Sequence, residues 1–416
     1  MIQDYDIVCI STSDWEQPWG SRQQIMTRLS SENRVLFVEY QSSFLHFLKY
    51  PNLYIRPPKK PIAGSVFRPR NPGLKPWWAP FSKIFTRRIR NIKDNLVVYK
   101  PLVNLPFRYH SKIINILNQR FLLFQLRRLV KNLKFYKILL WIFEPSAYFL
   151  VNRLGEKISI YQCIDFFKNE KKSYLRKKCI EAMENKLCED CDIVFVSTNE
   201  LLLDKLNLNK ETYLVPSAVD ESFFNINKSL SKFTIPGIIN NNLYPKIGFV
   251  GTLDGRIDYE LINFIAEAHY DWTIVLLGLV IDRRYAKCLN KRKNIQMLGW
   301  IDNNLLPLYI NSFDIGIAPY KINEFTKGIS PIKVFEYLAL AKPVVSTRIP
   351  SLEKYEDVIC IADNKEDFIR GIEILLKDKG KESSCKRLKL AQENTWSRRV
   401  DVISEVIEKH LNNSYN

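Results

Sequence analysis

The sequence has few histidines, and they lie far from one another. The 416 residues include only four, His46, His110, His269 and His410. Imidazole is the commonest metal ligand in proteins, and a structural or catalytic zinc site needs three or four ligands close together. We therefore expect no essential metal and no other cofactor.

Long apolar runs are also missing. A helix that spans a bilayer needs about 20 consecutive, mostly apolar residues. The best candidate, Ile138–Val151, is interrupted by Glu144. Residues Met1–Asp6 lead directly into a strand-like stretch and do not have the pattern of a secretory signal. We expect a protein without a spanning helix, one that meets a membrane only from the side.

The eight cysteines form no disulfide or zinc pattern. Only Cys188 and Cys191 make a CxxC pair, and neither a second pair nor a nearby histidine completes a metal site. This usage is typical of reduced, mostly buried thiols in a cytosolic protein.

Acidic residues are nearly absent from one segment. Residues 49–137 contain 21 Lys and Arg but a single acid, Asp94, in a chain whose net charge is +18. Such a field attracts anions: lipid headgroups, nucleic acid or a phosphorylated substrate. Within the segment, Phe81–Lys93 and Ser111–Lys134 have the composition of basic amphipathic helices, which favours a lipid surface. No nucleic-acid-binding motif is present, so we expect no nucleic-acid partner.

Short apolar runs alternate with helix-period segments in two blocks. This alternation predicts an α/β protein with two Rossmann-like, doubly wound parallel-sheet domains. We place the first domain at residues 1–215 and the second at 216–396, with a final helix at 397–411 packing back on the first. Ligands bind beyond the carboxyl ends of parallel strands, so the expected active site is a central cleft that both domains face.

One motif carries most of the chemical information: Gly328-Ile-Ser-Pro-Ile-Lys-Val-Phe-Glu-Tyr-Leu-Ala-Leu-Ala-Lys-Pro-Val-Val345. Ser330 as N-cap and Pro331 as first helical residue predict a helix start, whose free amides attract an anion together with Lys333. Glu336 lies among apolar residues, where a carboxylate is costly unless it is hydrogen-bonded, and sugar hydroxyls are suitable donors. The alternative is a glutamate on a solvent-facing stripe.

This motif resembles that of glycosyltransferase family four and its neighbours, which are nucleotide-sugar enzymes of the GT-B fold. The resemblance implies that Glu336 holds the ribose of the donor nucleotide. It also implies that Gly328, Ile329 and Ser330 present backbone amides to the diphosphate. The family often has an earlier glutamate eight residues before Glu336, and here that position is Gly328; Glu324 is nearby at a different spacing.

A second stretch resembles the opening strand and loop of the same family's donor domain. It runs from Lys246 to Asp258 and contains Gly251, Thr252 and Arg256. A glycine allows the backbone to approach a ligand closely, and an arginine reaches a phosphate. The resemblance implies donor contacts from these three residues; a solvated Arg256 is the alternative.

Two residues of the first domain are candidates for the acceptor side. Asp165 follows the predicted strand Ile158–Cys163, at a position where the family commonly has histidine and a branch of envelope-polysaccharide transferases has aspartate. The resemblance makes Asp165 the candidate catalytic residue, and capping of the next helix is the alternative. Arg22 follows the first strand and either binds an acceptor phosphate or lies on a helix surface.

These inferences predict a retaining, metal-independent glycosyltransferase. It would move a sugar from a nucleotide-diphosphate sugar to a lipid-linked or polysaccharide acceptor in cell-envelope glycan biosynthesis. We expect it in the cytoplasm, peripheral on the inner face of the cell membrane, with residues 49–137 on anionic lipid. A sugar-nucleotide epimerase or phosphorylase with the GT-B fold is the alternative.

Overall fold

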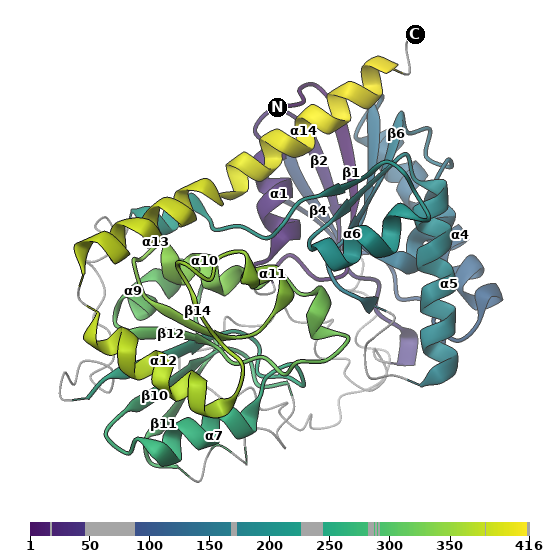
Figure 1. Ribbon diagram of the computed structural model, residues 1–416. Coiled ribbons are helices and arrows are strands. Elements are labelled where there is room, and N and C mark those ends of the chain that lie inside the picture. Colours follow the sequence, from purple (N-terminus) through teal and green to yellow (C-terminus); the bar gives the residue numbers. More distant parts are fainter. Residues whose placement is uncertain are drawn as a thin grey trace. The chain divides into compact units, whose positions relative to one another are not determined.

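The structure is a computed structural model that describes residues 1–16, 19–45, 88–167, 173–225, 244–281, 287, 289, 292–378 and 380–413. The chain divides into two compact units. Among the described residues, the first unit contains those up to Pro216 and from Arg399 onward, and the second contains Ser217–Arg398. Each unit is built on one sheet flanked by helices (Figure 1). The predicted α/β architecture with two Rossmann-like sheets is confirmed.

Within the described residues, the first sheet has the strand order β3-β4-β2-β1-β5-β6-β7-β8. The strands are β1 Asp6–Ile10, β2 Arg34–Val38, β3 Ile89–Lys93, β4 Leu96–Tyr99, β5 Ile138–Ile142, β6 Ile158–Cys163, β7 Ile193–Val196 and β8 Thr212–Leu214. All neighbours are parallel except β3 and β4. Every residue of β1, β5 and β6 is buried, as expected for strands covered on both faces.

The helices of the first unit include one of the two that were predicted in the basic segment 49–137. They are α1 Ser21–Leu29, η1 (a 3₁₀ helix) Pro145–Leu150, α4 Lys112–Asn132, α5 Tyr174–Asp190 and α6 Asn199–Leu206. The predicted helix at Ser111–Lys134 is confirmed as α4: Ser111 is its N-cap and accepts a hydrogen bond from the Ile114 N–H. That bond satisfies one of the free amides at the helix start.

The other predicted basic helix, Phe81–Lys93, is wrong where the structure describes it. Residues 81–87 lie outside the described residues, and Ile89–Lys93 form strand β3, antiparallel to β4. A turn at Asp94-Asn95, residue types that favour turns, joins the two strands. Four of the five residues of β3 are exposed, and two of the five, Arg90 and Lys93, are basic, which suits an edge strand because charge discourages further strand pairing.

The C-terminal helix α14, Trp396–Asn413, is the long yellow helix in Figure 1. Its residues from Arg399 onward belong to the first unit. One stripe of it is buried, comprising Val400, Ile403, Ile407 and Leu411. Polar contacts accompany this packing: Arg399 Nε donates to the Pro216 carbonyl at 3.1 Å, and His410 Nε2 lies 3.1 Å from a Glu211 carboxylate oxygen.

The second sheet is parallel throughout, in the order β11-β10-β9-β12-β13-β14. Its strands are β9 Lys246–Val250, β10 Thr273–Leu277, β11 Ile295–Gly299, β12 Ile315–Ala318, β13 Val344–Thr347 and β14 Cys360–Ala362. Its helices are η3 Glu221–Phe224, α7 Tyr259–Ala268, α9 Leu306–Asn311, η5 Thr326–Gly328, α10 Ile332–Leu338, α11 Pro350–Glu353, α12 Lys365–Lys377 and α13 Lys381–Glu393.

Both sheets have a point where the direction of strand addition reverses. In the first sheet β1 lies between β2 and β5, and in the second β9 lies between β10 and β12. Ligands of doubly wound proteins bind outside the carboxyl ends of the strands at such points. The loops after β1 and β5, and those after β9 and β12, are therefore the places to look for sites. No helix within the described ranges is long and apolar enough to cross a membrane.

Candidate functional sites

The helix that carries Glu336 begins one residue later than the sequence predicts. Pro331 is the N-cap of α10, and Ser330 lies before it. The Ser330 hydroxyl does not cap the helix, because it accepts a hydrogen bond from the backbone N–H of Ser217 at 3.1 Å. A buried amide needs a partner, and Ser330 supplies it. The Gly328–Ser330 turn is thereby tied to the first residue of the second unit.

Glu336 is buried, so the solvent-facing alternative is wrong. The residue is 6% exposed, and its Oε1 lies 2.8 Å from Nζ of Lys333, one turn earlier in the chain. Its other oxygen, Oε2, is buried and has no hydrogen-bond partner among the described residues. A buried polar atom without a partner costs about 1–3 kcal/mol. A ligand hydroxyl that donates to Oε2 would remove this cost.

Tyr337, next to Glu336, fixes α10 against the sheet. The Val250 N–H, at the end of β9, donates to the Tyr337 hydroxyl at 2.7 Å. Burial raises the pKa of Tyr337 well above its ordinary value, so the phenol stays neutral. Its ring lies over Gly316 of β12, where an added Cβ would be 2.5 Å from the ring. A glycine at this position therefore lets α10 approach the strands that border the predicted donor site.

The loop after β9 makes close backbone contacts with the loop after β10. Gly251 N donates to the Leu277 carbonyl at 2.8 Å. Gly278 has φ +145°, and a Cβ there would lie 1.8 Å from the Gly251 carbonyl oxygen. The two glycines thus have a packing reason as well as the ligand role predicted for Gly251. Thr252 follows, half-buried, at the same edge of the sheet.

Arg256 has a carboxylate partner two residues away. Arg256 Nε and Nη2 both donate hydrogen bonds to Oδ2 of Asp254, at 3.0 Å and 2.7 Å respectively. The guanidinium is therefore fixed in orientation and partly neutralised. The Arg256 carbonyl accepts a hydrogen bond from the Lys321 N–H at 2.8 Å, which joins the loops after β9 and β12.

In the first unit, the structure brings Arg22 and Asp165 together. Arg22 is half-buried on α1, so the surface alternative for this residue is wrong, and its Nη1 donates to the Thr12 hydroxyl at 2.7 Å. Burial lowers the pKa of Arg22, and the opposing charge of Asp165 counteracts this. Asp165 lies just after β6, and the cap of α5 is Ser173.

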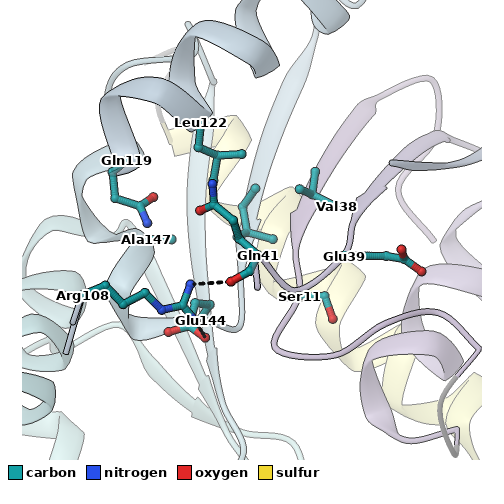
Figure 2. A pocket seen from close by; sticks show the side chains of 10 residues that line it. Ser11, Val38, Glu39, Gln41, Arg108, Gln119, Leu122, Glu144 and Ala147 are labelled. Atoms are coloured by element: carbon teal, nitrogen blue, oxygen red, sulfur yellow. Dashed lines mark hydrogen bonds and ion pairs between the residues drawn. The ribbon is translucent and has the colours of Figure 1, made fainter. Parts of the chain in front are cut away.

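A polar network that the sequence did not reveal lies beside these residues. Tyr109 donates to Oε1 of Glu144 at 2.9 Å, and Arg108 lies 3.6 Å from Oε2 of the same carboxylate. Figure 2 shows Arg108 and Glu144 close together, with Arg108 also donating to the Gln41 carbonyl at 3.2 Å. Glu144 follows β5, so the network is at the carboxyl edge of the first sheet. The segment Arg108-Tyr109 matches no motif that would have drawn attention to it.

In the part of the chain that the structure describes, no three His, Cys, Asp or Glu side chains are close enough together to hold a metal ion. The CxxC pair, Cys188 and Cys191, is buried and forms no disulfide among the described cysteines. Burial raises the pKa of Cys188 to about 12, so its thiol stays protonated at neutral pH. Metal independence of the reaction remains a prediction.

Solved structures place the whole chain in one fold class. It aligns with an alpha,alpha-trehalose 6-phosphate synthase from Burkholderia multivorans over 100% of this chain and 98% of that one, with TM-score 0.66 and 11% identity. It aligns with Anabaena Alr3699/HepE, solved in complex with UDP, over 97% and 100%, with TM-score 0.59 and 12% identity. At such low identities the likeness concerns the fold, which is GT-B.

Sequence comparison then adds the family of the second unit. Residues 244–378 match the family described as "Glycosyl transferases group 1". The putative teichuronic acid biosynthesis glycosyltransferase TuaH of Bacillus subtilis (strain 168) is 28% identical over 282 residues, which cover 62% of this chain and 68% of that protein. The protein is a glycosyltransferase of the GT-B type.

Proposed function

We propose that this protein is a retaining, metal-independent glycosyltransferase of cell-envelope glycan synthesis. It takes a nucleotide-diphosphate sugar as donor and a lipid-linked or polysaccharide acceptor. Support for the pathway comes from the likeness to TuaH, whose name places it in teichuronic acid biosynthesis. Support for the donor comes from two structural neighbours, one solved with UDP and one from E. coli with UDP-2-fluoro glucose.

The observation that carries the proposal is the unpartnered oxygen of Glu336. Oε1 is held by Lys333, and Oε2 is buried without a donor among the described residues. Ribose offers two adjacent hydroxyls, and a hydroxyl–carboxylate hydrogen bond is among the stronger kinds in proteins. The carboxylate thus matches the sugar of a nucleotide.

The diphosphate of the donor would lie between the Gly328–Ser330 turn, Lys333 and Arg256. Negative charge grows on the leaving diphosphate as the glycosidic bond loosens. Fixed cations and amide dipoles that face this charge stabilise the transition state. Because Asp254 already neutralises part of the Arg256 charge, we assign Lys333 and the backbone amides the larger share. These groups are the reason to propose a reaction that needs no metal.

Asp165 is the residue that we assign to the reacting sugar, and Arg22 to the acceptor phosphate. The charge of Asp165 acts against the lowering of the Arg22 pKa by burial and so favours the charged guanidinium that a phosphate needs. Retention of anomeric configuration rests on the resemblance to family four.

The membrane proposal rests on α4 and its surroundings. Described residues 88–137 contain 12 Lys and Arg and one acid, Asp94. Helix α4 itself has no acid, and its exposed apolar side chains are Ile113, Leu117, Phe121 and Phe124. Spacings of four, four and three residues put them on one helix face. Each Lys or Arg near an anionic bilayer contributes about 1 kcal/mol. We propose that this face lies on the inner surface of the cell membrane.

A panel of nucleotides and nucleotide sugars tests the donor site by thermal shift, because a ligand that binds only the folded state raises the melting temperature. The proposal expects one nucleotide diphosphate and its sugar conjugate to stabilise the wild-type protein, and to stabilise Glu336→Ala much less. Absence of stabilisation by every member of the panel would contradict it.

A further inference from the structure

A pocket in the first unit lies beside Arg108 and Tyr109, two members of the Glu144 network. It has a volume of about 190 Å³, and ten residues line it: Tyr40, Gln41, Ser43, Asn104, Leu105, Phe107, Arg108, Tyr109, His110 and Arg176. Sites for drug-sized ligands measure about 300–1,000 Å³. This pocket therefore suits a single small group rather than a nucleotide.

The charge of the lining is positive. Arg108 and Arg176 contribute two guanidinium groups, and none of the ten lining residues is an acid. Glu144, which is not one of the lining residues, lies 3.6 Å from Arg108 and balances its charge. Arg176 has no such carboxylate among the described residues, and its Nε is buried without a hydrogen-bond partner. An anion in the pocket would supply what Arg176 lacks.

Aromatic rings hold both cations in place. The Arg108 guanidinium lies 4.6 Å from the ring centroids of Tyr40 and of Tyr109, and the Arg176 guanidinium lies 4.9 Å from the Tyr109 ring. An arginine stacked on a ring is already restricted before a ligand arrives. It therefore loses less conformational entropy when the ligand binds. The two guanidinium groups are thus pre-arranged around the Tyr109 ring.

The rim of the pocket is apolar and exposed. Leu105 and Phe107 are 51% and 58% exposed. Phe107 adopts φ 66°, an uncommon conformation for a bulky residue and one that is often retained at binding sites. Leu105 is joined to α4 by backbone hydrogen bonds with the Asn118 amide at 2.8 and 3.1 Å. The apolar rim therefore continues into the first turns of α4, where Ile113 and Leu117 are exposed.

We propose that this pocket binds the phosphate of a phosphate ester whose apolar tail lies along the rim and the exposed face of α4. The phosphate oxygens accept hydrogen bonds from the guanidinium groups of Arg176 and Arg108, and the tail covers Leu105 and Phe107. This inference rests on the proposed function only in naming the ester as part of the acceptor, a part distinct from the phosphate that we assign to Arg22. The binding itself needs no sugar donor.

Hexyl phosphate and inorganic phosphate are suitable probes, with binding measured by titration calorimetry on the full chain. Wild-type protein binds hexyl phosphate more tightly than inorganic phosphate. Arg176→Ala weakens both by about tenfold or more, since a charged hydrogen bond is lost. Lys186→Ala removes one positive charge from the same helix at an exposed position, 52% by side chain, and leaves both affinities unchanged.

Phe107→Asn tests the tail separately, because asparagine tolerates positive φ. It weakens hexyl phosphate and leaves inorganic phosphate unchanged. Equal wild-type affinities for the two probes would assign the pocket to soluble phosphate and overturn the lipid part. No binding of either, or equal losses in Arg176→Ala and Lys186→Ala, would overturn the whole inference. Donor binding at Glu336 is measured on the same variants, so a failure of the donor site is recognised independently.

Discussion

Glu336→Gln is the substitution that separates a ligand role of this residue from a structural one. The change keeps the size of the side chain and removes its charge. A hydrogen bond to a charged group contributes about 1.5–3 kcal/mol and a neutral one about 0.5–1.5 kcal/mol. The expected loss on donor binding is therefore about 1–2 kcal/mol, or about 5- to 30-fold in Kd. Calorimetric titration with the nucleotide identified by thermal shift measures it.

Without ligand, the Glu336→Gln substitution should not lower the free energy of unfolding. Oε2 of Glu336 has no partner in the described part of the chain, and Lys333, 21% exposed, can turn to solvent when its ion pair is lost. The variant without ligand should accordingly be as stable as the wild type in urea, or slightly more stable. A structural carboxylate would instead give a loss of stability.

Glu382→Gln is the matched control. Glu382 and Lys386 on α13 are also 2.8 Å apart, with side chains 81% and 60% exposed. Exposed pairs of this kind contribute about 0–1 kcal/mol to stability. Donor affinity should be unchanged in this variant. Equal donor affinity in wild type, Glu336→Gln and Glu382→Gln would refute the assignment of ribose to Glu336.

Three further predictions follow from the structure. Tyr337→Phe leaves the buried Val250 N–H without an acceptor and should lower the free energy of unfolding by about 1–3 kcal/mol in urea titrations; an unchanged midpoint would contradict the anchoring role. Asp165→Asn should reduce kcat by at least about tenfold with little change in donor Kd, and an unchanged kcat would remove Asp165 from the reaction. In flotation assays the protein should bind vesicles that contain phosphatidylglycerol and lose them as salt rises; equal binding to neutral phosphatidylcholine vesicles would argue against an electrostatic membrane surface.

The sheets could be predicted from sequence because many of their strands contain a short, buried apolar run. Strands such as β5 and β7 are buried along their whole length, and each is a short apolar run with helix-period residues nearby. The β3–β4 hairpin could not be predicted in this way. An exposed basic edge strand has the same composition as one side of an amphipathic helix, and only its pairing partner separates the two.

The candidate sites were predictable where neighbouring residues determine them and obscure where the fold does. The burial of Glu336 follows from its own helix, whereas the partner of Ser330 is Ser217, which is 113 residues earlier. Tyr109 and Glu144 are 35 residues apart, so their hydrogen bond depends on how the chain at the start of α4 packs against η1, which Glu144 caps. The Asp254–Arg256 pair is different, because the partners are two positions apart in the sequence and their charges could have been read as a pair.

A transfer assay tests the central claim most directly. The protein is incubated with the nucleotide sugar that it binds and a bacterial lipid extract, in the presence of EDTA, and products are identified by mass spectrometry. We predict that nucleoside diphosphate appears together with a lipid whose mass has increased by one sugar residue, and that both need the extract. Release of sugar 1-phosphate, isomerised donor in the absence of lipid, or dependence on added metal would contradict the account.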